Sequence, residues 1–135
     1  MLKEHLEKLC SDLELGALAP KDKNKCYALS LSDCRMTLQE LDPGFYIKAV
    51  IGECPKEKKE DLFLYIMRAN FLGQGTGGNV IGLDEEEKNL TLSQNIPYDS
   101  TFREFKETIE DFVNYVDYWR EELKRHQKAA QDSIL

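Results

Sequence analysis

The glycine-rich stretch from Gly73 to Gly78 is the part of the chain that most resembles a site of chemistry. Gly73, Gly75 and Gly78 have the G-x-G-x-x-G spacing that is typical of dinucleotide-binding loops. That motif holds a pyrophosphate only where a strand precedes the loop and a helix follows it, because the helix N-terminus must face the phosphates. Here an apolar, helix-favouring segment precedes the glycines and a short strand-like segment follows them. We therefore interpret the glycines as a helix end and a turn, and we predict no cofactor.

The other reactive side chains are not spaced as metal or catalytic sites require. The four cysteines lie at positions 10, 26, 34 and 54 without a C-x-x-C pair, and the two histidines are far apart. Zinc ligands usually occur in closely spaced pairs, and no serine or cysteine lies in a nucleophile-elbow context. Acidic runs such as Asp84–Glu87 are typical of solvated loops. We predict no metal site and no enzyme, with reduced cysteines acting as small apolar side chains.

The composition is that of an ordinary acidic globular protein. The chain has 135 residues, of which 41% are hydrophobic and 32% charged, and its net charge is −7. This length predicts a single domain, 1–135. The negative charge argues against nucleic-acid partners and anionic membranes, and no apolar run is long enough to span a membrane. The first residues have no apolar signal region, so we expect a cytoplasmic protein.

The segment before the glycines predicts a helix that is apolar on both sides. On a helical wheel, Leu62, Tyr65, Ile66 and Ala69 fall on one side. The apolar residues of the opposite side are Phe63, Leu64, Met67 and Phe71. Because a surface helix of a monomer shows one apolar stripe, we expect the protein's own sheet to cover one side and another subunit to cover the other.

Hydrophobic periodicity assigns the remaining elements. Leucines at positions 2, 6, 9 and 13 form one stripe of an amphipathic helix, and period-two alternation predicts strands. The predicted strands are 27–31, 36–39, 45–51, 79–83 and 89–96. Apolar residues at steps of three and four predict a final helix over 102–123, opened by a Thr101/Glu104 capping box. We expect the tail from Lys124 to 135 to fray.

The predicted order is therefore α-β-β-β-α-β-β-α. Short linkers between the strands favour antiparallel neighbours. This gives an α+β fold in which an antiparallel five-stranded sheet packs against helices.

This order and several local stretches resemble the class I chaperones of bacterial type III secretion, the CesT and SycE-like family. The stretches are DLELGAL at 12–18, LSLSD at 29–33, FYIKAVIG at 45–52, MRANFLGQGTGG at 67–78, and NLTL at 89–92 followed by a proline. Their combination covers essentially the whole chain. The chlamydial members are the most similar.

The resemblance implies a small cytosolic dimer that binds the N-terminal region of a secreted effector and keeps it export-competent. The partner subunit is either a second copy or a related chaperone. The implied dimer interface is Phe63, Leu64, Met67, Phe71, Val80 and Ile81. The implied cargo-binding residues are Leu2, Leu6, Leu9, Leu13, Met36 and Leu38.

Two alternatives stay open. The leucine stripe of the first helix is either plain core or, in part, an open groove for an apolar cargo segment. We expect Leu2 and Leu6 to line the groove and Leu9 and Leu13 to lie in the core. The second function that fits the chain is a regulatory protein that couples secretion to transcription by binding part of the transcription apparatus.

Overall fold

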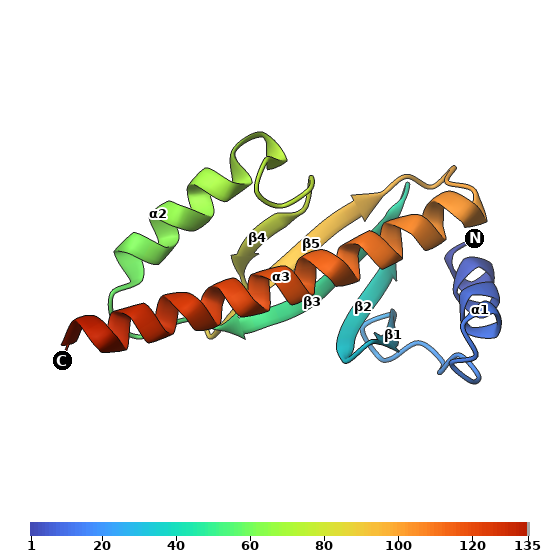
Figure 1. The fold of residues 1–135 in the computed structure, drawn as a ribbon. Coiled ribbons are helices and arrows are strands. Elements are labelled where there is room, and N and C mark those ends of the chain that lie inside the picture. Colours follow the sequence, from blue (N-terminus) through green and yellow to red (C-terminus); the bar gives the residue numbers. More distant parts are fainter. Residues whose placement is uncertain (135) are drawn as a thin grey trace. The chain divides into compact units, whose positions relative to one another are not determined.

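The computed structural model describes the backbone of residues 1–134 and the side chains of residues 1–129. The helices are α1 (Leu2–Asp12), α2 (Lys59–Asn70) and α3 (Phe102–Ile134), with a short 3₁₀ turn, η1 (Phe71–Gly73). The strands are β1 (Cys26–Leu31), β2 (Cys34–Glu40), β3 (Phe45–Glu53), β4 (Val80–Leu83) and β5 (Asn89–Ile96) (Figure 1). The predicted order of helices and strands is confirmed.

The strands form one five-stranded sheet in the order β1-β2-β3-β5-β4, so β1 and β4 are its edge strands. The pairs β1/β2, β2/β3 and β4/β5 are antiparallel, as the short linkers predict. Ser32 and Asp33 join β1 to β2 with φ angles of 50° and 63°. Two such left-handed residues match the twist of the flanking strands in a two-residue hairpin. The α+β class is thus confirmed.

The chain forms two compact units. Unit 1 comprises residues 1–49 and 94–113, and unit 2 comprises residues 50–93 and the chain from residue 114 onward. The strands β3 and β5 and the helix α3 each contribute residues to both units.

In unit 1, α1 is held against the start of α3 through His5. The imidazole ring stacks on Phe105 with 5.0 Å between ring centroids and meets Phe45 edge-on at 6.1 Å. Its Nε2 atom lies 3.0 Å from the Ser100 carbonyl oxygen, where it donates a hydrogen bond. A half-buried histidine is therefore part of the core packing, with its polar atom satisfied by the backbone.

In unit 2, α2 packs through the side that includes Leu62, Ile66 and Ala69, which are buried. The Trp119 indole nitrogen donates to the Gly75 carbonyl oxygen at 3.2 Å and so ties α3 to the glycine loop. The Tyr65 hydroxyl donates to Glu122 at 3.1 Å. Partial burial, and then the bond to Glu122, raise the pKa of Tyr65 to about 12, because both disfavour the phenolate.

The helix α3 begins as predicted and extends further than predicted. The Glu104 N–H donates to the Thr101 hydroxyl at 3.2 Å, which satisfies one free donor of the first turn. Beyond Lys124 the helix continues to Ile134 instead of fraying. At the start of this extension, two ion pairs join side chains that lie one helical turn apart: Lys124 with Glu121 at 3.4 Å and Arg125 with Glu122 at 3.2 Å.

The glycine loop follows α2 and precedes β4, in the helix-then-strand order that the sequence predicts. Gly77 has a φ of +62°, and an added Cβ atom there would overlap the ring of Tyr115. Gly75 approaches Ala69 so closely that an added Cβ atom would lie 2.9 Å from the Ala69 Cβ atom. Glycine at these positions serves backbone conformation and close packing.

We therefore predict that Gly77→Ala lowers the free energy of unfolding by about 1–3 kcal/mol, through backbone strain and overlap. Gly82→Ala is the matched control, because an added Cβ atom there meets no atom within 4 Å. Chemical denaturation followed by the fluorescence of Trp119, the one tryptophan of the chain, measures both. Equal unfolding free energies for the two variants would contradict this account of the loop.

Candidate functional site

The outer edge of β1 is the first candidate site, and it lies in unit 1. The Leu31/Cys34 pair closes the two-residue β1/β2 hairpin. Hydrogen-bonded and non-hydrogen-bonded pairs alternate along an antiparallel ladder. Leu31, Leu29 and Tyr27 therefore bond to β2, whereas the residues between them direct their backbone N–H and C=O groups away from it.

Only part of this edge is occupied by the chain itself. The Cys26 N–H donates to the Asp22 carboxylate at 3.0 Å, and the Cys26 carbonyl oxygen accepts from the Asp22 N–H at 3.0 Å. Ala28 and Ser30 are exposed, and within residues 1–134 no hydrogen bond from outside the sheet reaches their backbone. The edge of β1 thus offers four unpaired backbone groups to an extended chain.

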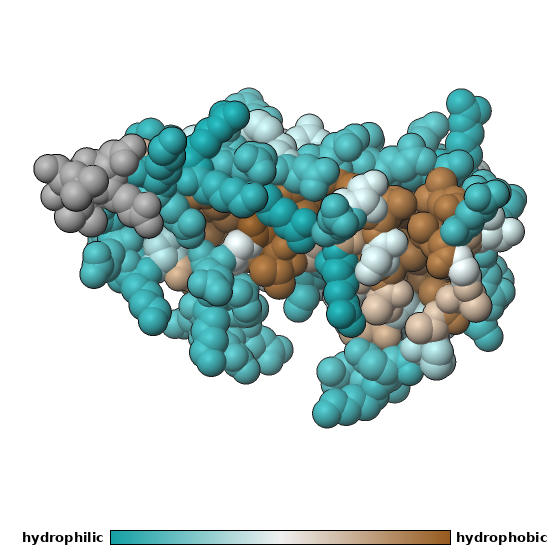
Figure 2. Space-filling view, turned by 60° about the horizontal axis from the view of Figure 1, so that its bottom comes forward, coloured by the Kyte–Doolittle hydropathy of each residue, from teal (hydrophilic) through white to brown (hydrophobic). Residues whose placement is uncertain are grey.

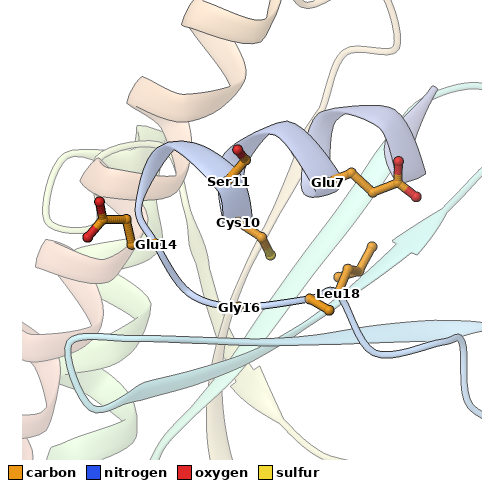
Figure 3. Close-up of a pocket in the computed structure, with 7 residues that line it drawn as sticks. Glu7, Cys10, Ser11, Glu14, Gly16 and Leu18 are labelled. Carbon is orange, nitrogen blue, oxygen red and sulfur yellow. The ribbon is translucent and has the colours of Figure 1, made fainter.

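A hollow of about 560 Å³ lies beside α1 in the same unit. It is lined by Glu7, Cys10, Ser11, Glu14, Gly16, Ala17 and Leu18. Figure 3 shows the side chains of Cys10 and Leu18 pointing into the space between the helix and the segment that follows it. Burial raises the pKa of the Cys10 thiol, so this side chain is neutral and apolar in character. The hollow can receive apolar side chains between two carboxylates.

Five of the six predicted cargo residues lie in the core instead of on a surface. Leu2, Leu6 and Leu9 of α1 are fully buried, and the open groove expected at Leu2 and Leu6 is wrong. The docked helix thus leaves no open groove at Leu2, Leu6 or Leu9. Met36 and Leu38 are also fully buried, because alternate residues of β2 face the interior together with Cys34. Leu13, after the end of α1, is half-buried.

The second candidate site is an apolar face of unit 2, called here the α2/β4 face. Its exposed residues are Leu64, Met67, Phe71 and Leu72 together with Val80 and Leu83, which flank the β4 edge from the two sides of that strand. Met67, Phe71 and Leu72 expose 68%, 67% and 79% of their surface. Figure 2 shows one side of the molecule, on which hydrophilic side chains surround a band of hydrophobic residues. Large apolar side chains exposed together usually mark an interaction site.

Four of the six predicted interface residues belong to this face: Leu64, Met67, Phe71 and Val80. Phe63 is half-buried. Ile81 is 3% exposed and offers no surface to a partner, because alternation along β4 turns it to the interior. Leu72 was not predicted. It has a φ of 55°, which breaks the helical path and is not readable from the sequence.

The described part of the chain has no helix that is long and apolar enough to cross a membrane. Within the same residues, no three His, Cys, Asp or Glu side chains are grouped so that they could hold a metal ion.

Comparison with known proteins gives a family match. Residues 4–120 match the sequence model of the Tir chaperone protein (CesT) family. A Chlamydia pneumoniae protein is 25% identical over 126 residues, which is 91% of this chain and 96% of that protein.

Among solved structures, the HopA1–SchA chaperone–effector complex is similar with a TM-score of 0.68 and 19% identity, over 89% of this chain and 93% of the other. The Yersinia pestis type III secretion chaperone SycH, solved with a stable fragment of YscM2, is similar with a TM-score of 0.66 and 13% identity. The region of similarity covers 88% of this chain and 99% of SycH.

The fold also occurs in YbjN of E. coli, a candidate transcription regulator, with a TM-score of 0.69 and 14% identity over 92% of each chain. At such identities the structures show a common fold only.

The burial of the leucine stripe predicts the effect of a truncation. Leu6→Ala should lower the free energy of unfolding by about 2–5 kcal/mol, because it leaves a cavity in unit 1. Ser11→Ala, exposed on the same helix, should change it by no more than about 0.5 kcal/mol. Urea denaturation measures both variants. A loss below about 1 kcal/mol for Leu6→Ala would show that this leucine is open to solvent.

Proposed function

We propose, because the chain belongs to the Tir chaperone protein (CesT) family, that it binds the N-terminal region of a secreted effector in the cytoplasm and keeps it export-competent. Two structural neighbours, SchA and SycH, were solved with an effector and with a fragment of YscM2. Their complexes support a protein partner for this chain.

The observation that carries the proposal is the open edge of β1. An extended effector segment adds to this edge as a further strand and pairs with the backbone of Ala28 and Ser30. Each backbone hydrogen bond contributes about 0.5–1.5 kcal/mol net, and pockets for alternate side chains supply specificity. The hollow beside Cys10 and Leu18 is such a pocket within unit 1. Backbone pairing holds the segment extended, as export requires.

The α2/β4 face binds a second copy of the chain. A monomer that exposed Met67, Phe71 and Leu72 together would carry an apolar patch of the kind that soluble monomers usually avoid. A related chaperone is the other occupant that this face could take.

The strand-addition mode predicts a selective loss of binding in Ala28→Pro. Proline lacks the N–H that faces the open edge, whereas the pairing of β1 with β2 does not use this group. The variant should fold and bind the cargo fragment about tenfold more weakly, the effect of one lost hydrogen bond at the upper end of its range. Ala28→Thr, which keeps the N–H, is the matched control.

Binding is measured by calorimetry with the N-terminal fragment of the protein encoded beside this chain in its genome, the first candidate cargo. If that fragment does not bind the wild-type chain, the same measurement proceeds with the other secretion substrates of the source organism. A folded Ala28→Pro variant that binds cargo as tightly as Ala28→Thr would contradict strand addition at β1.

The α2/β4 face predicts that Met67→Glu dissociates the assembly. A carboxylate buried in an apolar interface without a partner is costly, so the variant should scatter light as one chain of 15.6 kDa while the wild type scatters as two. Asn114→Glu adds the same charge at an exposed position of α3 and should stay dimeric. A wild type that is a clean monomer at micromolar concentration would overturn the second-copy assignment, and solubility only with a related chaperone would replace it by a heterodimer.

The regulatory alternative is favoured by one observation, the shared fold of YbjN. Purified RNA polymerase and the candidate cargo fragment, each immobilised, distinguish the two functions. Retention of the chain by the cargo fragment supports the chaperone, and retention by polymerase alone supports the regulator.

A further inference from the structure

The edge strand β4 of unit 2 differs from β1 in how its backbone groups are used. The Asp84 N–H donates to the Asn89 carbonyl oxygen at 3.0 Å just beyond the β4/β5 ladder. The alternation of the ladder then makes Gly82 and Val80 the residues that bond to β5. Ile81 and Leu83 therefore direct their backbone groups to the open side.

The side-chain amide of Asn70 occupies one of these outward positions. Its Nδ2 atom donates to the Ile81 carbonyl oxygen at 2.9 Å, and the Ile81 N–H donates to its Oδ1 atom at 2.9 Å. These are the two bonds that a residue of an added strand would make with Ile81. Asn70 is the last residue of α2, so its amide comes from the helix that borders the same face.

The next outward position is also occupied. The Asn79 N–H donates to the Thr76 carbonyl oxygen at 3.2 Å, and the Asn79 carbonyl oxygen accepts from the Thr76 hydroxyl. Of the outward positions from Asn79 to Leu83, Leu83 is thus the one whose backbone stays open among the described residues.

This occupancy matters because β4 lies in the α2/β4 face, where Val80 and Leu83 are 56% and 43% exposed. A bare β4 edge could pair with the open β1 edge of another copy, and such head-to-tail pairing repeats because every copy has both edges. If the α2/β4 face binds a second copy through its side chains, the backbone of β4 must therefore be kept from pairing with another strand.

We propose that Asn70 caps the edge of β4, so that a second copy docks on the α2/β4 face through side chains and not by strand pairing. The occupant, a second copy, rests on the proposed function, whereas the cap itself rests on the bonds between Asn70 and Ile81. The two edges of the sheet thereby have different roles. The edge of β1 can pair with an added strand, whereas the capped edge of β4 cannot.

Asn70→Ala tests the cap, with Asn114→Ala, an exposed asparagine of α3, as the matched control. Light scattering over a concentration series should give the wild-type mass for the control. Asn70→Ala should give species larger than the wild type that grow with concentration. In these species, hydrogen exchange at the Ile81 amide should be slowed about tenfold relative to dilute Asn70→Ala, because a new strand pairs there.

An Asn70→Ala variant with the wild-type mass at every concentration would overturn the proposal. This readout is independent of the dimer assignment: if the wild type is a monomer, growth of Asn70→Ala beyond one chain still supports the cap.

If Asn70→Ala does not fold, the variant Asn70→Asp tests the cap instead. At neutral pH its carboxylate can accept from the Ile81 N–H but repels the Ile81 carbonyl oxygen, so larger species should form. Below the usual carboxyl pKa of about 3.9 the protonated acid can donate to that oxygen, and the mass should return to that of the wild type at the same pH. A mass that follows the wild type at both pH values, or failure of both variants to fold, would assign Asn70 to the fold alone and overturn the proposal.

Discussion

The need to hydrogen-bond every backbone group at a sheet edge is the constraint on which the other features of this chain depend. A closed barrel removes its edges, but an open five-stranded sheet must leave two. Along the edge of β4 the chain supplies partners itself at two positions, with the Asn70 amide on Ile81 and Thr76 on Asn79, and leaves Leu83 open among the described residues. At β1 it supplies only Asp22, on Cys26. The difference between the edges follows from these local bonds.

The two units also differ in how much apolar surface they leave exposed. In unit 1, Leu2, Leu6 and Leu9 of α1 are buried in the core, so the proposed binding of cargo there uses backbone groups and the hollow beside Cys10. In unit 2 the outer side of α2 stays open. Fully burying a side chain such as Met67 or Phe71 contributes roughly 1.5–3 kcal/mol, and association costs about 4–15 kcal/mol of lost freedom. The six residues of this face expose between 43% and 79% of their surface, so each can contribute only part of that amount to association.

The sequence predicted those features that depend on local periodicity. The three- and four-residue steps of α3, the alternation in the strands and the helix–glycine–strand order are all present. The predictions from sequence were wrong where the burial of a side chain depends on residues that are distant in the chain. Leu2 and Leu6 are buried on a helix whose His5 contacts Phe105 and Ser100, which lie 95 or more residues away in the chain. The family resemblance placed Ile81 in the interface, whereas alternation along β4 turns its side chain to the interior.

Other features had no signal in the sequence. An asparagine at the end of a helix reads as a helix-terminating residue, and only the fold brings its amide to Ile81. The open groups at Ala28 and Ser30 depend on the hairpin register, which the left-handed Ser32 and Asp33 fix. The extension of α3 beyond Lys124 has no apolar periodicity to indicate it, and the exposed ion pairs at its start contribute little.

Backbone amide exchange in the chaperone–cargo complex tests the central claim most directly. The amides of Ala28 and Ser30 should exchange rapidly in the free chain and become protected when the N-terminal fragment of the cargo is bound, while the Ile81 amide, already bonded to Asn70, should change little. A complex of the same stoichiometry in which Ala28 and Ser30 stay unprotected would contradict strand addition at β1.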